Sequence, residues 1–119
     1  MKHILCVSDN DRLLIERGRL LEQQGYRVTS ALGFKEAFAV CQGSAFDLVI
    51  LGHSIPYADK KTLIENLRSS SATPVLSIWQ HDGRVVDTAH YLGFSDKPDE
   101  LLKSVSIILA KGSAADAGQ

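Results

Sequence analysis

Short apolar runs alternate with amphipathic stretches five times along the chain. The first four runs predict strands at about residues 3–7, 26–31, 47–51 and 75–79. The run at 47–51 is apolar on both faces, which is typical of a central strand in a parallel sheet. A fifth strand is expected in the few residues between Gly93 and Lys97, so it should be short or irregular.

The stretches between these runs have the spacing of helices. They predict helices at about 12–24, 34–41, 60–69 and 83–91, and a last helix that begins at Pro98 and ends at Gly112. Residues 1–112 are therefore expected to form a single domain. The small residues at 113–119 have nothing to bury and are expected to be a flexible C-terminal tail.

This alternation of strands and helices predicts an α/β fold. Right-handed crossovers place the strands in one parallel sheet with helices on both faces, a three-layer sandwich. Five units at this length fit the flavodoxin-like (βα)5 arrangement, with strand order 2-1-3-4-5. In that order a site forms where the first and third strands end, which here means Ser8-Asp9 and Gly52-His53.

Composition and charge exclude several classes of function. The chain has 119 residues, and its 13 basic and 14 acidic residues leave a net charge of −1 with no basic run. A nucleic-acid or acidic-membrane surface is therefore not expected. No apolar stretch is long enough to cross a membrane and no signal segment is visible, which favours a cytoplasmic protein. Cys6 and Cys41 are expected to be free thiols.

No zinc-binding spacing of cysteine and histidine occurs, and no glycine-rich phosphate loop is present. We therefore expect no cofactor and no metal.

Several segments, in this order, resemble the receiver domain of bacterial response regulators, the CheY-like superfamily, over about residues 2–110. The segments are Ile4–Arg12, Leu20–Val28, Phe46–Leu51 with Ile55-Pro56, Thr73–Leu76, and Lys97-Pro98. The resemblance implies a role in two-component or phosphorelay signalling. It also implies a phosphorylation site with five parts: a nucleophilic aspartate, two acids that hold Mg²⁺, a hydroxyl and a lysine.

Carried over position by position, the resemblance finds little of that site. The nucleophile position is Gly52, the two acid positions are Ser8 and Asp9, the hydroxyl position is Trp79, and the lysine position is Lys97. Glycine cannot form an acyl phosphate. The chain is therefore identified as an atypical member that lacks the phospho-acceptor aspartate.

The same substitutions change the charge of the site. Three carboxylates and a lysine sum to −2, whereas Asp9 and Lys97 sum to zero. A single carboxylate is a poor Mg²⁺ site, so no metal is expected to bind at millimolar Mg²⁺. Asp9 also has a structural interpretation as the N-cap of the first helix, which we favour, with Asn10 and Asp11 as competitors for that position.

Two residues near the site keep alternative interpretations. The indole of Trp79 either fills the space left at Ser8 and Gly52 or lies half exposed at the rim of the sheet. His53 is a conceivable substitute acceptor beside Gly52, although a loop histidine is the favoured interpretation.

The leading functional hypothesis is a phosphorylation-independent protein-interaction module that is not an enzyme. The resemblance implies a histidine kinase, an output domain or a second receiver as partner, bound at a face that includes His81, Arg84, His90 and Tyr91. Two alternatives stay open at this point. One is a conventional phosphoryl-accepting switch that uses another residue, and the other is a flavodoxin-like binder of a small ligand.

Overall fold

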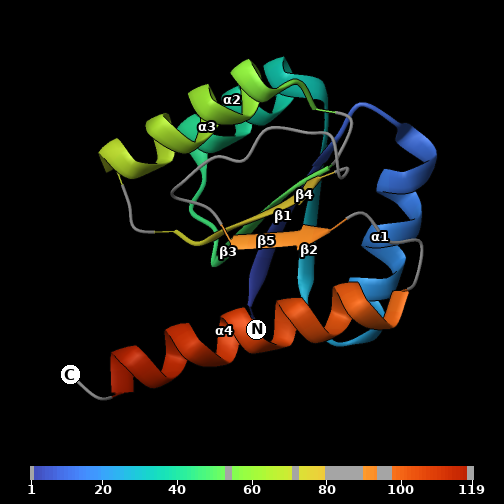
Figure 1. Ribbon diagram of the computed structural model, residues 1–119, viewed down its shortest axis with the longest axis vertical. Coiled ribbons are helices and arrows are strands. Elements are labelled where there is room, and N and C mark those ends of the chain that lie inside the picture. The colour runs from blue at the N-terminus through green and yellow to red at the C-terminus, as the bar shows by residue number, and fades with distance from the viewer. Residues whose placement is uncertain (1, 53–54, 71–72, 80–89, 94–97, 118–119) are drawn as a thin grey trace.

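The computed structural model describes residues 2–52, 55–70, 73–79, 90–93 and 98–117 of the chain (Figure 1). Its strands are β1 (His3–Ser8), β2 (Arg27–Leu32), β3 (Leu48–Leu51), β4 (Val75–Trp79) and β5 (His90–Gly93). Its helices are α1 (Asp11–Gln23), α2 (Gly33–Gly43), α3 (Tyr57–Ser70) and α4 (Pro98–Ala117).

The five strands form one parallel sheet in the order β2-β1-β3-β4-β5. This is the order that the sequence predicted. Helices α2 and α3 lie on one face of the sheet, and α1 and α4 lie on the other (Figure 1). The predicted flavodoxin-like three-layer fold is therefore confirmed.

Alternating side chains of the strands build a separate core on each face. In β1, Leu5 and Val7 pack in the cluster under α2 and α3, whereas Ile4 and Cys6 pack in the cluster under α1 and α4. The central strand β3 is buried along its whole length, because both of its faces are covered. The carboxyl ends of β1 and β3 are thereby held rigidly between two packed layers.

The N-cap of α1 is Asn10, which corrects the assignment to Asp9. Asn10 has extended backbone (φ −114, ψ 111), and its Oδ1 accepts a hydrogen bond from Leu13 N at 3.1 Å. This geometry satisfies one of the free amides of the first turn. At the other end, Gly25 has φ +92, a backbone conformation that suits glycine just after a helix.

Two other boundaries differ from the predictions. Residues 90 and 91 were assigned to a helix at 83–91, but they belong to strand β5. This strand pairs with β4, with His90 opposite Leu76 and Gly93 opposite Trp79. A short apolar segment fits either pattern, and here β4 offers an edge that needs hydrogen-bond partners. Strand β5 is also earlier than predicted, since it ends at Gly93; residues 80–89 and 94–97 lie outside the described ranges.

The last helix was predicted to end at Gly112, but α4 continues to Ala117. Glycine inside a helix costs only about 1 kcal/mol relative to alanine, and the alanines that follow are strong helix formers. The predicted division into a domain at 1–112 and a flexible tail at 113–119 is otherwise untested and stays a prediction.

Candidate functional site at the carboxyl ends of β1 and β3

Parallel pairing brings Ser8 and Gly52 together at one edge of the sheet. Val7 pairs with Leu51, and the Gly52 amide donates a hydrogen bond to the Val7 carbonyl at 2.8 Å. A Cβ built on Gly52 would lie 3.4 Å from the Ser8 Cβ. The predicted meeting of these two positions is therefore confirmed.

The two residues that follow the core of β1 face different surroundings. Ser8 is fully buried, and its Oγ accepts a hydrogen bond from the Asn10 amide at 3.0 Å. Asp9 is exposed, and its Oδ1 lies beside the β2–α2 junction, 3.6 Å from the position of a Cβ on Gly33. The carboxylate of Asp9 therefore neighbours the end of β2, and it forms no ion pair with any residue the structure describes.

A side chain at Gly52 would be tightly surrounded, and its neighbours would have to shift by a few tenths of an ångström. Its ideal Cβ would lie 3.1 Å from the Val7 carbonyl oxygen and 3.2 Å from Nη1 of Arg17. Both separations are tighter than most contacts of real Cβ atoms, and the carbonyl oxygen belongs to the rigid sheet. The first atom of any side chain at position 52 would therefore contact the guanidinium group of Arg17.

Sequence reasoning missed Arg17. It lies on the inward face of α1 together with Leu14, Gly18 and Leu21, and it is only 7% exposed. Its Nη1 is enclosed and has no hydrogen-bond partner among the residues that the structure describes. Burial lowers the pKa of Arg17, and Cys6 and Glu16 oppose that effect; a guanidinium keeps its charge in proteins. A buried positive charge therefore lies beside Gly52, and Glu16 on the same helix acts on it electrostatically.

Cys6 does not neutralise that charge. It lies in the core cluster on the α1 face, and burial raises the pKa of its thiol to about 11 against the opposing effect of Arg17. The thiol is therefore neutral at physiological pH.

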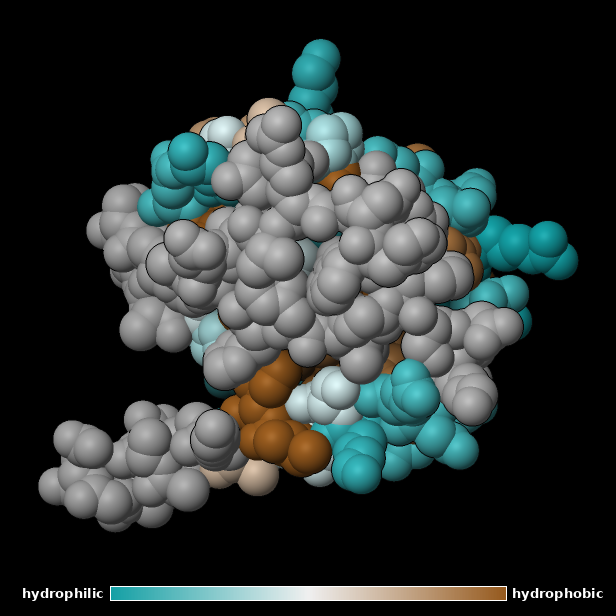
Figure 2. Space-filling model, in the orientation of Figure 1, coloured by the Kyte–Doolittle hydropathy of each residue, from teal (hydrophilic) through white to brown (hydrophobic). Residues whose placement is uncertain are grey.

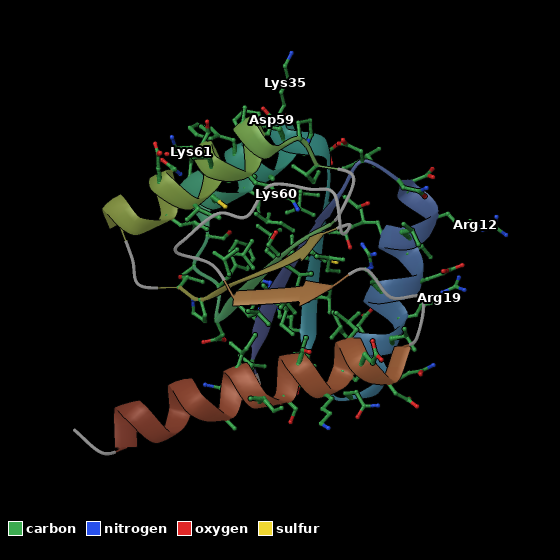
Figure 3. The ribbon with its side chains drawn as sticks, in the orientation of Figure 1. Arg12, Arg19, Lys35, Asp59, Lys60 and Lys61 are labelled. Carbon is green, nitrogen blue, oxygen red and sulfur yellow. The ribbon has the colours of Figure 1, made fainter. Side chains whose placement is uncertain are left out.

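A second buried cation, Lys60, was also missed. It extends from α3 toward the sheet, whereas the neighbouring Asp59 and Lys61 point away from it (Figure 3). Its Nζ donates hydrogen bonds to Ser77 Oγ at 3.0 Å and to the Ile78 carbonyl at 2.7 Å. Burial lowers the pKa of Lys60 to about 8.

Both residues carry a signal that the sequence does contain. Arg17 falls at helical spacing from Leu14 and Leu21, and Lys60 falls at helical spacing from Leu63 and Leu67. A charged residue inside an apolar stripe marks a buried charge that needs an explanation.

The residues present do not fit the Mg²⁺ ion that the receiver resemblance implies. Magnesium requires several oxygen ligands in near-octahedral geometry. Among the residues described at this edge, Asp9 contributes a carboxylate, whereas Arg17 adds a positive charge. Within the described part of the chain, no group of three or more His, Cys, Asp or Glu residues is placed to hold a metal ion.

Of the remaining predicted site residues, the structure describes only some, and of those only the backbone. Trp79 ends β4, and its backbone pairs with Gly93, but its side chain lies outside what the structure describes. His90 and Tyr91 lie in β5, and here too only the backbone is described. The other predicted residues, His53, His81, Arg84 and Lys97, lie outside the described ranges.

Comparison with known proteins places this fold among receiver domains. No protein-family profile matches the chain. Protein PetR of Rhodobacter capsulatus is 28% identical over 116 residues, which are 92% of this chain and 49% of PetR. The chain thus spans about half the length of that relative.

Two solved structures illustrate the structural likeness. The receiver domain of the Francisella response regulator 1452 superposes with a TM-score of 0.80 at 22% identity, covering 94% of this chain and 99% of that one. The complex of histidine kinase ThkA with response regulator protein TrrA contains a chain with a TM-score of 0.78 at 24% identity, covering 92% and 99%. At these identities the likeness shows the fold, which is that of response regulator receiver domains.

No described helix is both long and apolar enough to span a membrane.

Proposed function

We propose that this chain is an atypical receiver domain that works as a phosphorylation-independent protein-interaction module and not as an enzyme. The observation that carries the proposal is the structure around Gly52. A receiver of the usual kind needs a carboxylate at the end of β3 to attack phosphorus. Here that position has no side chain, and the space next to it is bordered by the Val7 carbonyl and the Arg17 guanidinium.

The electrostatics of the site support the same proposal. An acceptor site of the usual kind concentrates negative charge so that a divalent cation can bind. Here the enclosed charge is the positive one of Arg17, and the remaining acid, Asp9, lies beside Gly33. Phosphoryl transfer requires a carboxylate nucleophile and several oxygen ligands for a metal ion. The residues described at this edge supply neither.

The interaction role is supported by the fold and by the surface of α4. The complex of ThkA with TrrA joins a histidine kinase to a response regulator, and we propose a partner of that kind, an output domain or another receiver for this chain. Figure 2 shows apolar surface over α4, where Ile107 is 53% exposed. A contiguous apolar surface on this helix is suited to contact with a protein partner.

The test is whether the chain accepts a phosphoryl group. The purified protein is incubated with acetyl phosphate and Mg²⁺, and its intact mass is then measured. We expect no mass gain, because no described residue places a carboxylate at the end of β3 to act as the nucleophile. A receiver domain that carries the acceptor aspartate, treated in the same buffer, must gain one phosphoryl group to validate the conditions.

A gain of one phosphoryl group on this chain would overturn the proposal. Peptide mapping would then identify the acceptor, with His53 as the first residue to inspect.

A further inference from the structure

The outer edge of β2 is an open edge of the sheet. Among the described strands, β2 comes first in the strand order and pairs with β1 alone. The Arg27 amide donates to the Lys2 carbonyl of the neighbouring strand segment, at 2.9 Å. Because main-chain groups alternate in direction along a strand, those of Val28 and Ser30 point away from β1. These two residues therefore offer N–H and C=O groups with which a further strand can pair.

The strand carries none of the usual obstacles to such pairing. Natural edge strands are often protected by proline or by charged side chains within the strand. After Arg27, the five remaining residues of β2 include neither. Ser30 is exposed, and the residue of α1 that faces it is Gly18, on which a Cβ would lie 3.7 Å from Ser30 Oγ. The middle of β2 is therefore accessible from outside the domain.

Two exposed apolar side chains lie at the same edge. Leu32, the last residue of β2, is 45% exposed, and Ile15 on α1 is 54% exposed. Ile15 is three residues before Gly18, so it lies on the flank of α1 that is close to β2. Apolar surface beside open main-chain groups favours a protein partner that adds a strand to the sheet.

The charges at the two ends of β2 favour a second copy of this chain as that partner. Arg27 begins the strand and is exposed. Two exposed acids lie at the other end: Glu36, whose Oε2 accepts from the Leu32 amide, and Asp9, whose Oδ1 lies beside Gly33. Antiparallel pairing of two copies brings the basic end of each strand to the acidic end of the other. Opposite charges across such a pair are stabilising.

We propose that two copies of this chain associate by antiparallel pairing of their β2 strands, which joins their sheets into one. Thr29 of each copy lies opposite Thr29 of the other, at the twofold axis. Val28 of each copy then exchanges hydrogen bonds with Ser30 of the other, which uses every outward N–H and C=O group of these two residues. The inference rests on the proposed interaction role and deepens it, because the second receiver is another copy of the same chain.

The test is analytical ultracentrifugation of the full chain over a wide range of protein concentration, with Ser30→Pro as the variant. We expect a concentration-dependent equilibrium between monomer and dimer. Proline at position 30 removes an N–H that points away from β1, so the pairing of β1 with β2 is kept. The dissociation constant of the dimer should rise by roughly tenfold or more, because each copy loses a hydrogen bond to the other.

Ser30→Ala is the matched control. It removes the same hydroxyl group but keeps the main-chain N–H, so it should dimerise as the unaltered protein does. Arg27→Glu serves as a second variant if Ser30→Pro fails to fold. It brings acidic groups together at both ends of the pair, and its dimer should also be weaker, most clearly at low ionic strength.

An NMR experiment on a mixture of isotope-labelled and unlabelled protein tests the register. Directly opposite residues of a pair that shares no hydrogen bonds have Cα atoms only about 4.5 Å apart. We therefore expect a nuclear Overhauser effect between the Hα atoms of Thr29 in the two copies.

Three outcomes would overturn the proposal. The protein could remain monomeric even at the millimolar concentrations used for NMR. A dimer could have the same dissociation constant in Ser30→Pro and Ser30→Ala, which would place the interface elsewhere. A dimer could also lack the Thr29 contact. None of these outcomes changes the mass expected after acetyl phosphate treatment, and a mass gain would overturn the proposed function without changing the association state, so the two failures are distinguishable.

Discussion

Among the described residues, each face of the sheet buries a cation, and the two cations have different surroundings. On the α3 side, Lys60 reaches across to β4 and donates to two oxygen atoms, Ser77 Oγ and the Ile78 carbonyl. On the α1 side, Arg17 reaches the end of β3, and its enclosed Nη1 has no acceptor within the described part of the chain. The two residues are nearly equally buried, at 4% and 7% exposure, so burial alone does not separate them.

The difference lies in what each cation is next to. Lys60 has a complete explanation within the fold, because its bonds tie α3 to β4. Arg17 has none, and it lies beside a position at which a side chain is missing. A satisfied buried charge is explained by the fold alone, whereas an unsatisfied buried donor needs a further explanation.

The largest expected effect concerns Lys60 and pH. Its pKa is about 8 in the folded protein against an ordinary value of 10.5. Between these values the unfolded chain binds more protons than the folded one, so stability must rise with pH as the buried charge is lost. Relative to Lys60→Met, the unaltered protein should gain up to roughly 3 kcal/mol of unfolding free energy across this window.

Urea unfolding of both proteins at about pH 7 and about pH 10 measures this gain. The Cys6 thiol also titrates in alkaline solution, with its pKa raised to about 11, but it is present in both proteins and cancels in the difference. A difference in stability that does not change with pH would mean that Lys60 is not buried as a charged group.

A smaller effect is expected from the pair of Gly52 and Arg17. Gly52→Ala should destabilise the protein by about 1–2 kcal/mol, because its Cβ enters a space bounded by the Val7 carbonyl and by Nη1 of Arg17. Arg17→Leu should be neutral or stabilising, since replacing a buried ion with an apolar residue often is. In the Arg17→Leu background, the loss of unfolding free energy caused by Gly52→Ala should be smaller by at least about 0.5 kcal/mol.

A double-mutant cycle from chemical denaturation measures that coupling. Gly43→Ala is the control, because a Cβ on Gly43 would meet nothing within 4 Å. If the two substitutions at 52 and 17 are additive, the guanidinium does not limit the space beside Gly52.

Much of the fold could be predicted from the sequence, because periodicity reports directly on burial. The strand order and four of the five strands follow from the apolar runs, and β4 was located at its observed bounds, 75–79. The errors fall where local patterns are ambiguous: His90 and Tyr91, the first two residues of β5, were taken as the end of a helix, and the cap of α1 is Asn10 and not Asp9.

The candidate site was only half predictable. The predicted strand order located Ser8 and Gly52 at one edge, because a strand end fixes the backbone position. It could not locate Arg17 or Lys60, whose heads lie far from their own backbones at the end of long side chains. Which group such a chain reaches depends on packing across helices and strands, and no local motif reports that.

The central claim is that the edge formed by Ser8 and Gly52 is suited neither to Mg²⁺ nor to phosphoryl transfer. A titration with MgCl₂ to millimolar concentration, followed at the amides of Ser8, Asp9 and Gly52 by NMR, tests it most directly. The account predicts no saturable shift in the unaltered protein. A saturable Mg²⁺-dependent shift confined to these residues would contradict it.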